Sequence, residues 1–138
     1  MPKKELGNLY IKLGDYDNGI KIFVKAIEDA ELYYSIDIDD FAKKMAIYAD
    51  LANAYNRKKD IKSSIAICKK GLAIIENSNF YKKTTLDTKF YINTSLIESY
   101  LLNDNATLAL QYAQENITIA SQLDEPFICS AAYEALAL

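Results

Sequence analysis

The sequence predicts an all-α protein, an α-solenoid of antiparallel helix pairs with about seven helices. Two observations carry this prediction. Apolar residues recur at helical spacing along the chain, and one block of residues repeats at a fixed interval. No segment shows the alternating pattern of a strand. We expect a single domain over residues 1–138, because a chain of this length suits one domain with a real core.

The repeated block places equivalent residues 45 positions apart. It begins at Leu6, Leu51 and Leu96, and a tyrosine follows each leucine four positions later. A short polar turn then leads to a residue that can cap the next helix. These capping residues are Asp15, Asp60 and Asn105. In the second helix of each unit, one register holds small residues that let two helices approach closely, namely Gly19, Ser64 and Ala109.

The pattern and its breakers give the order of the helices. Gly14 and the run from Asn77 to Asn79 separate helices, and Pro126 stands in the first turn of the last one. The expected helices span residues 3–13, 16–33, 37–58, 61–76, 84–102, 106–122 and 125–138. The expected repeats span residues 1–36, 37–80 and 81–124, with a half repeat at 125–138. The last helix shows no C-cap signal, so we expect a piece of a longer solenoid.

Composition and charge argue against several classes of function. The net charge is −3 and the basic residues are dispersed, which does not favour direct nucleic-acid binding. No apolar run approaches the ~18 residues of a membrane span, and no leader segment is apparent, so we expect a cytoplasmic protein. The chain has no histidine, which removes Ser-His-Asp and Cys-His catalysis and most zinc sites. We therefore expect that the protein is not an enzyme and that it binds no cofactor and no metal.

Two further features are interpreted as structural. Cys68 and Cys129 stand alone, and we expect both to be buried thiols, because a free cysteine behaves as a small hydrophobe. Asp37, Asp39 and Asp40 form an acidic run that lacks the glycine and the ligand spacing of a calcium loop. A linker followed by the favourable charges of a helix N-terminus explains this run better.

The first unit resembles the tetratricopeptide repeat. The residues that carry the resemblance are Leu6, Gly7, Tyr10, Gly14, Tyr16, Gly19, Phe23 and Ala26. The second unit is a weaker copy, and the third keeps chiefly Leu96, Tyr100 and Ala109. The usually bulky position three before the leucine holds Lys3, Tyr48 and Asn93. The closing proline is also missing, and the 45-residue period exceeds the family's common length of about 34.

The resemblance implies a right-handed superhelix that binds a peptide or protein segment. Its long repeats, with a composition rich in Lys, Ile, Asn and Tyr, resemble those of the peptide-sensing regulators and phosphatases of Gram-positive bacteria. By that resemblance the chain is expected to be part of a larger bacterial regulator or adaptor. A DNA-binding domain elsewhere in such a protein is left open.

In this family the first helix of each pair lines a concave groove, on the face opposite the leucine and tyrosine positions. The candidate binding residues are Lys4, Asn8, Asn53, Asn56, Arg57, Tyr91, Thr94 and Glu98. Asn8 and Asn53 share a register, and their amides offer a donor and an acceptor to an extended peptide. Glu98 occupies the third equivalent position and breaks the pattern. The alternative is that both asparagines are ordinary solvated surface residues.

Lys4 and Asn8 also resemble the first half of the carboxylate clamp by which some family members hold a peptide C-terminus. The other members of the clamp are absent, because Asp50, Tyr91 and Ser95 stand in their places. We therefore do not expect a complete clamp.

Two functions remain open from the sequence. The first is a non-enzymatic module that binds a peptide or protein segment in the groove. The second is a structural scaffold that assembles through exposed solenoid ends, and it predicts a homodimer, whether biological or due to truncation. The apolar residues that would drive this assembly are Phe127, Ile128 and Leu138. The sequence does not identify the partner.

Overall fold

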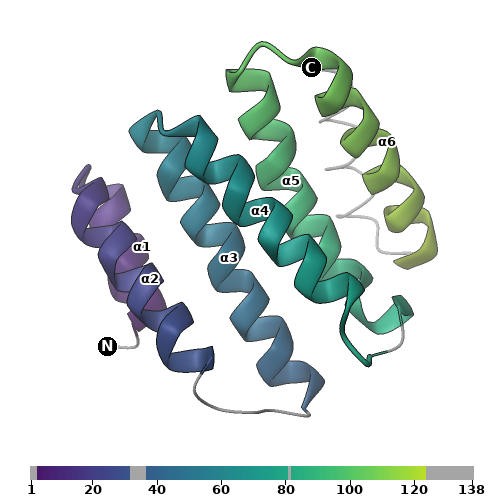
Figure 1. The fold of residues 1–138 in the computed structure, drawn as a ribbon, viewed down its shortest axis with the longest axis horizontal. Helices are drawn as coiled ribbons and strands as arrows, with labels where there is room; N and C mark the ends of the chain where they lie inside the picture. The colour runs from purple at the N-terminus through teal and green to yellow at the C-terminus, as the bar shows by residue number, and fades with distance from the viewer. Residues whose placement is uncertain (1–2, 32–36, 81, 124–138) are drawn as a thin grey trace.

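The computed structural model describes residues 3–31, 37–80 and 82–123, which form six α-helices in three successive antiparallel pairs (Figure 1). The pairs are α1 (Lys3–Lys12) with α2 (Tyr16–Glu31), α3 (Ile38–Lys58) with α4 (Ile61–Glu76), and α5 (Leu86–Leu102) with α6 (Ala106–Leu123). A short 3-10 turn, η1 (Lys82–Thr85), precedes α5. The predicted all-α class is confirmed. The seventh expected helix, 125–138, lies outside the described residues, as does Cys129.

The pairs stack in chain order, from α1 and α2 at one end of the array to α6 at the other (Figure 1). Each helix packs against the next one along the chain, and α3 also contacts both α1 and α5. The first helices of the three pairs therefore form one layer of the molecule. This layer presents a continuous face, on which the groove described below lies.

The turns inside the three pairs share one geometry. Each contains a residue in the left-handed region, namely Gly14 at φ 84°, Lys59 at φ 70° and Asp104 at φ 57°. The next residue donates its backbone N–H to the carbonyl of Tyr10, Tyr55 or Tyr100 at 2.9, 2.9 and 2.8 Å. Its side chain accepts from the backbone N–H of Asn18, Ser63 or Leu108 at 3.4, 3.3 and 3.2 Å. The capping roles predicted for Asp15, Asp60 and Asn105 are confirmed.

Replacing Lys59 with glycine is expected to stabilise the protein. A side chain in the left-handed region costs about 1–2 kcal/mol, and glycine is the residue that most often ends a helix in this conformation. Part of this gain is offset by the extra freedom of glycine in the unfolded chain, so we expect a net gain of about 0.5–1 kcal/mol in urea unfolding. Gly14→Ala is the matched control and should shift the midpoint the other way. A destabilised Lys59→Gly variant would contradict the argument.

In each pair, the side chains at one facing position of the two helices complement each other in size. A Cβ atom added at Gly7 in α1 would lie only 2.7 Å from the Phe23 ring in α2. The equivalent positions 45 residues on are Ala52 and Cys68, and the next are Ile97 and Ala113. All six residues are buried. The side chain on the first helix grows along the array while the one on the second shrinks, which keeps the packed volume similar.

Other predictions for the interior are also confirmed. Cys68 is fully buried, and burial raises the pKa of its thiol to about 12, so it is an inert packing residue. A Cβ atom at Gly19 would lie 2.5 Å from Ile11 Cδ1 and 3.1 Å from the Gly7 carbonyl oxygen, which shows the close approach of α1 and α2.

None of the helices in the described ranges is long and apolar enough to cross a membrane.

The helix boundaries differ from expectation mainly before α5. The helix predicted from residue 84 begins instead at Leu86, because η1 occupies the preceding residues and Thr85 Oγ1 donates to the Lys82 carbonyl oxygen at 3.0 Å. At α3 the N-cap is Asp37, whose Oδ1 accepts from the Asp39 backbone N–H at 2.8 Å. The acidic run therefore serves a helix N-terminus, as predicted.

Candidate functional site: the concave groove

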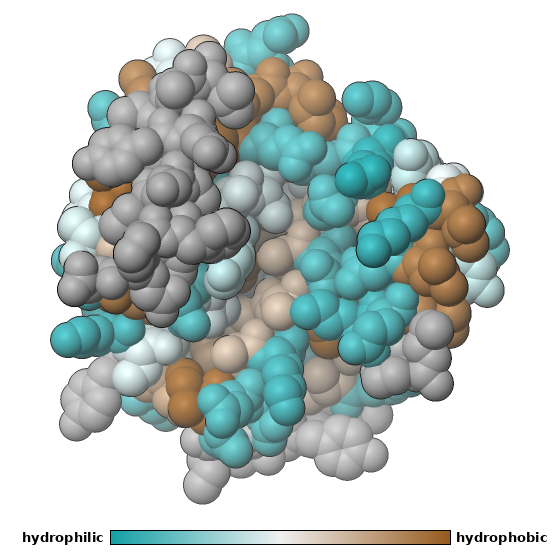
Figure 2. Space-filling view, turned by 180° about the vertical axis from the view of Figure 1, so that it is seen from behind, coloured by the Kyte–Doolittle hydropathy of each residue, from teal (hydrophilic) through white to brown (hydrophobic). Residues whose placement is uncertain are grey.

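A groove of about 320 Å³ lies across α1, α3 and α5. We call it the α1/α3/α5 groove. Its lining residues are Lys4, Ala42, Met45, Ala46, Ala49, Asp50, Asp87, Thr88 and Tyr91. Figure 2 shows this face of the molecule, where a hollow with a pale brown floor is bordered by teal, hydrophilic side chains. The volume lies at the lower end of the range found for binding sites.

The floor of the groove comes from α3. Ala42, Ala46 and Ala49 recur at spacings of four and three residues, so they lie on one face of the helix. Their short side chains leave a depression because the neighbouring helices carry longer ones, Lys4 on α1 and Tyr91 on α5. Tyr91 is 51% exposed, which leaves its ring available for contact with a ligand.

Asp50 and Lys4 form the charged wall of the groove. Lys4 Nζ lies 3.6 Å from Asp50 Oδ2, and the Asp50 side chain is 26% exposed. Oδ2 itself is buried and has no hydrogen-bond partner among the described residues. Burial raises the pKa of the Asp50 carboxyl, whereas Lys4 and the nearby Asn8 amide lower it, and the net shift is upward. The carboxylate is therefore incompletely compensated for its loss of water.

The structure brings only two of the eight candidate residues into this groove, Lys4 and Tyr91. Asn8 lies beside Asp50 and lines a separate depression on α1 together with Glu5, Leu9 and Lys12. The other candidates that remain accessible but do not line the groove are Asn53, Arg57, Thr94 and Glu98. Thr94 Oγ1 is occupied by bonds within the protein, since it donates to the Phe90 carbonyl oxygen at 2.9 Å and accepts from Asn116 Nδ2 at 3.3 Å.

Asn56 is a correction to the predicted site, because it is only 1% exposed and cannot meet a ligand. Its Nδ2 donates to the Ser95 carbonyl oxygen at 3.4 Å, and its Oδ1 accepts from Ser99 Oγ at 3.0 Å. Ser99 Oγ in turn lies 2.7 Å from Ser64 Oγ, which donates to the Ala52 carbonyl oxygen at 3.0 Å. These bonds tie α3, α4 and α5 together. Asn56 is thus a structural residue between the second and third pairs.

Sequence reasoning missed the acidic residues of the groove, Asp50 and Asp87. Asp50 was considered only as a position where the carboxylate clamp lacks its asparagine. Asp50 also lies four residues after Ala46 and so on the same face of α3, and this spacing was the available signal. The geometry argues further against a clamp, because Lys4 faces a carboxylate of the chain itself.

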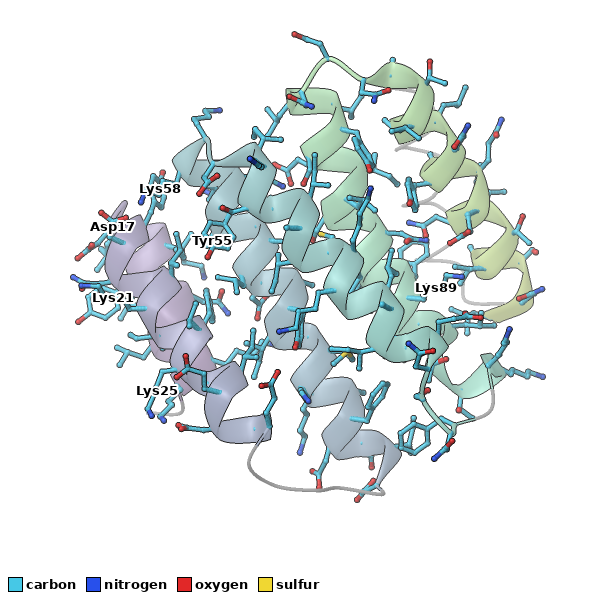
Figure 3. All side chains as sticks on the ribbon, viewed as in Figure 1. Asp17, Lys21, Lys25, Tyr55, Lys58 and Lys89 are labelled. Atoms are coloured by element: carbon cyan, nitrogen blue, oxygen red, sulfur yellow. The ribbon has the colours of Figure 1, made fainter. Side chains whose placement is uncertain are left out.

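The opposite side of the array carries exposed charges held largely in pairs. Figure 3 shows Asp17, Lys21 and Lys25 along α2, with Lys58 of α3 close to Asp17. Lys58 Nζ lies 2.5 Å from Asp17 Oδ1, and the Lys58 ammonium lowers the pKa of the Asp17 carboxyl. Such exposed pairs contribute little to stability, because water screens them. Across the described segments, no three His, Cys, Asp or Glu side chains gather as metal ligands.

Comparison with known families gives a match in the first two helix pairs. The tetratricopeptide repeat family model matches residues 5–28 and 46–78, within the first two helix pairs. Among curated proteins, none matches the sequence significantly. The first two helix pairs therefore contain tetratricopeptide repeats. Such repeats generally mediate protein–protein interactions and are typically non-catalytic.

Proposed function

We propose that this tetratricopeptide-repeat module binds an extended peptide or protein segment in the α1/α3/α5 groove. The observation that supports the proposal best is the groove itself, about 320 Å³ in volume and lined by residues from the first helix of all three pairs. In this proposal α5 and α6 form a third repeat. Its support is the inner turn of that pair, which has the geometry of the first two.

The lining of the groove suits a peptide. The alanine floor of α3 leaves room for a backbone and short side chains, while Tyr91 offers an aromatic surface at the edge. The polar groups on the walls can fix the orientation of a bound segment. We place the module in a larger regulator or adaptor, on the resemblance of its long repeats to those of peptide-sensing regulators.

Filling the groove is expected to weaken peptide binding strongly. Peptides selected from a randomised heptapeptide library on the wild-type protein would be measured by fluorescence anisotropy against Ala46→Trp. The indole should occupy the floor and weaken binding at least tenfold, since it takes the volume that the ligand needs. Ala66→Trp is the matched control, because Ala66 is exposed on α4 and does not line the groove.

The results separate the groove from other surfaces. If both variants lose peptide binding equally, binding lies elsewhere. The same follows if Ala46→Trp keeps its peptide binding while its circular dichroism is unchanged. Failure to select any peptide would favour the alternative of a scaffold that assembles through its ends. That alternative depends on residues 125–138, which lie outside the described structure.

A further inference from the structure

We propose that the groove selects a cationic segment, in which a lysine or arginine side chain pairs with Asp50 and takes the place of Lys4. This inference rests on the proposed function and adds the chemistry of the ligand. It follows from the charge of the groove, the state of the Asp50 carboxylate and the exposure of its present partner.

The charge of the lining is the first argument. Among the groove residues, Asp50 and Asp87 are acidic and Lys4 alone is basic, which leaves a formal net charge of −1. Asp50 lies on α3 and Asp87 on α5, so the two carboxylates belong to adjacent helices of the groove. A peptide carboxylate would meet this surface unfavourably, whereas an ammonium or guanidinium group would complement it.

The second argument is the incomplete pairing of Asp50. Its buried Oδ2 accepts no hydrogen bond from the described residues, and Lys4 Nζ stands at 3.6 Å, beyond normal hydrogen-bond distance. A buried carboxylate oxygen that accepts no hydrogen bond is costly. A guanidinium can offer two parallel N–H donors to one carboxylate, which Lys4 does not do at its present distance.

The third argument is that Lys4 can leave at little cost. Its side chain is 46% exposed, in the first turn of α1. Exposed ion pairs of this kind contribute little to stability, so the ammonium can move into water without a large penalty. The aliphatic stem of an incoming lysine or arginine can then lie on the alanine floor, and the exposed Tyr91 ring can interact with its charge.

The test uses a positional-scanning library of acetylated, amidated heptapeptides, with Arg, Lys, Leu or Glu fixed at one position at a time. Mixtures with fixed Arg or Lys should bind most tightly. Asp50→Asn should weaken the binding of these mixtures about tenfold. It should leave the binding of mixtures with fixed Leu unchanged. Lys4→Met should strengthen the binding of the mixtures with fixed Arg or Lys severalfold, because it removes the competing ammonium.

Glu28→Gln is the control for net charge, because Glu28 is exposed on α2 and outside the groove. This variant should bind all mixtures as tightly as the wild type does. Asp50→Asn keeps the size of the side chain and removes an undercompensated charge, so the variant should be at least as stable to heat as the wild type. If it unfolds, the Lys4→Met variant still tests the exchange.

The outcomes distinguish this inference from the proposed function. Preference for Glu mixtures, weakened by Lys4→Met, would overturn the cationic ligand but support peptide binding. Binding that is indifferent to the fixed residue would overturn the inference alone. If no mixture binds, both the inference and the proposed function fail.

Discussion

Gly7→Ile is expected to lower the free energy of unfolding by about 3 kcal/mol, and Phe23→Ala by about 3–5 kcal/mol, but the double variant should lose less than either. Isoleucine at position 7 would collide with the Phe23 ring, since even a Cβ atom there lies 2.7 Å from it. Removing the fully buried ring alone leaves a cavity. Together the two changes reproduce the pair Ile97 and Ala113, which is buried in the third helix pair.

Urea unfolding of the four proteins in a double-mutant cycle measures this coupling. Ala66→Ile is a control at an exposed position and should change stability by less than about 0.5 kcal/mol. Additive losses in the double variant would show that the two positions do not share one packed volume. The exchange of large and small residues along the array would then have another cause.

Alkaline pH is expected to destabilise the protein through Tyr48. This side chain is fully buried, and its hydroxyl donates to Glu31 Oε1 at 3.3 Å. Burial, followed by the Glu31 charge, raises the pKa of Tyr48 to about 12 from an ordinary value of 10.0. The unfolded chain therefore releases this proton first, so the stabilisation is complete below pH 10 and is lost as the pH rises towards 12. About 2–3 kcal/mol should disappear over this range.

Tyr48→Phe isolates this contribution. The variant should lose less stability than the wild type between pH 10 and 12, in urea titrations at constant ionic strength. Tyr91→Phe is the matched control for removal of a tyrosine hydroxyl, because the Tyr91 ring is 51% exposed and lies outside the packed core. Parallel pH profiles for wild type and Tyr48→Phe would show that Tyr48 does not titrate as argued.

The fold was predictable because its signals are local and repeated. Helical spacing and the capping residues act within a few turns of helix, and the 45-residue step repeats them along the chain. All three can therefore be recognised without knowing the tertiary structure. Lys59 and Asp104 show a limit of this reasoning. They adopt the left-handed conformation that Gly14 adopts at the equivalent position, although the residue type alone does not predict it.

The groove was less predictable because it depends on contacts between pairs. Helical geometry selected Lys4 and Tyr91, and both of these residues line the groove. It also selected Asn56, because a helical stripe does not reveal that α5 packs over this residue and supplies Ser95 and Ser99 as its partners. The role of Asp50 likewise depends on Lys4 of another helix.

The most direct test of the central claim is a map of amide chemical-shift changes when the tightest heptapeptide from the randomised library is added to the labelled full chain. We expect the largest changes to cluster around Lys4, Ala46, Asp50 and Tyr91, on the three helices that line the groove. Changes concentrated on α2 and α4, with the groove residues unaffected, would contradict this claim.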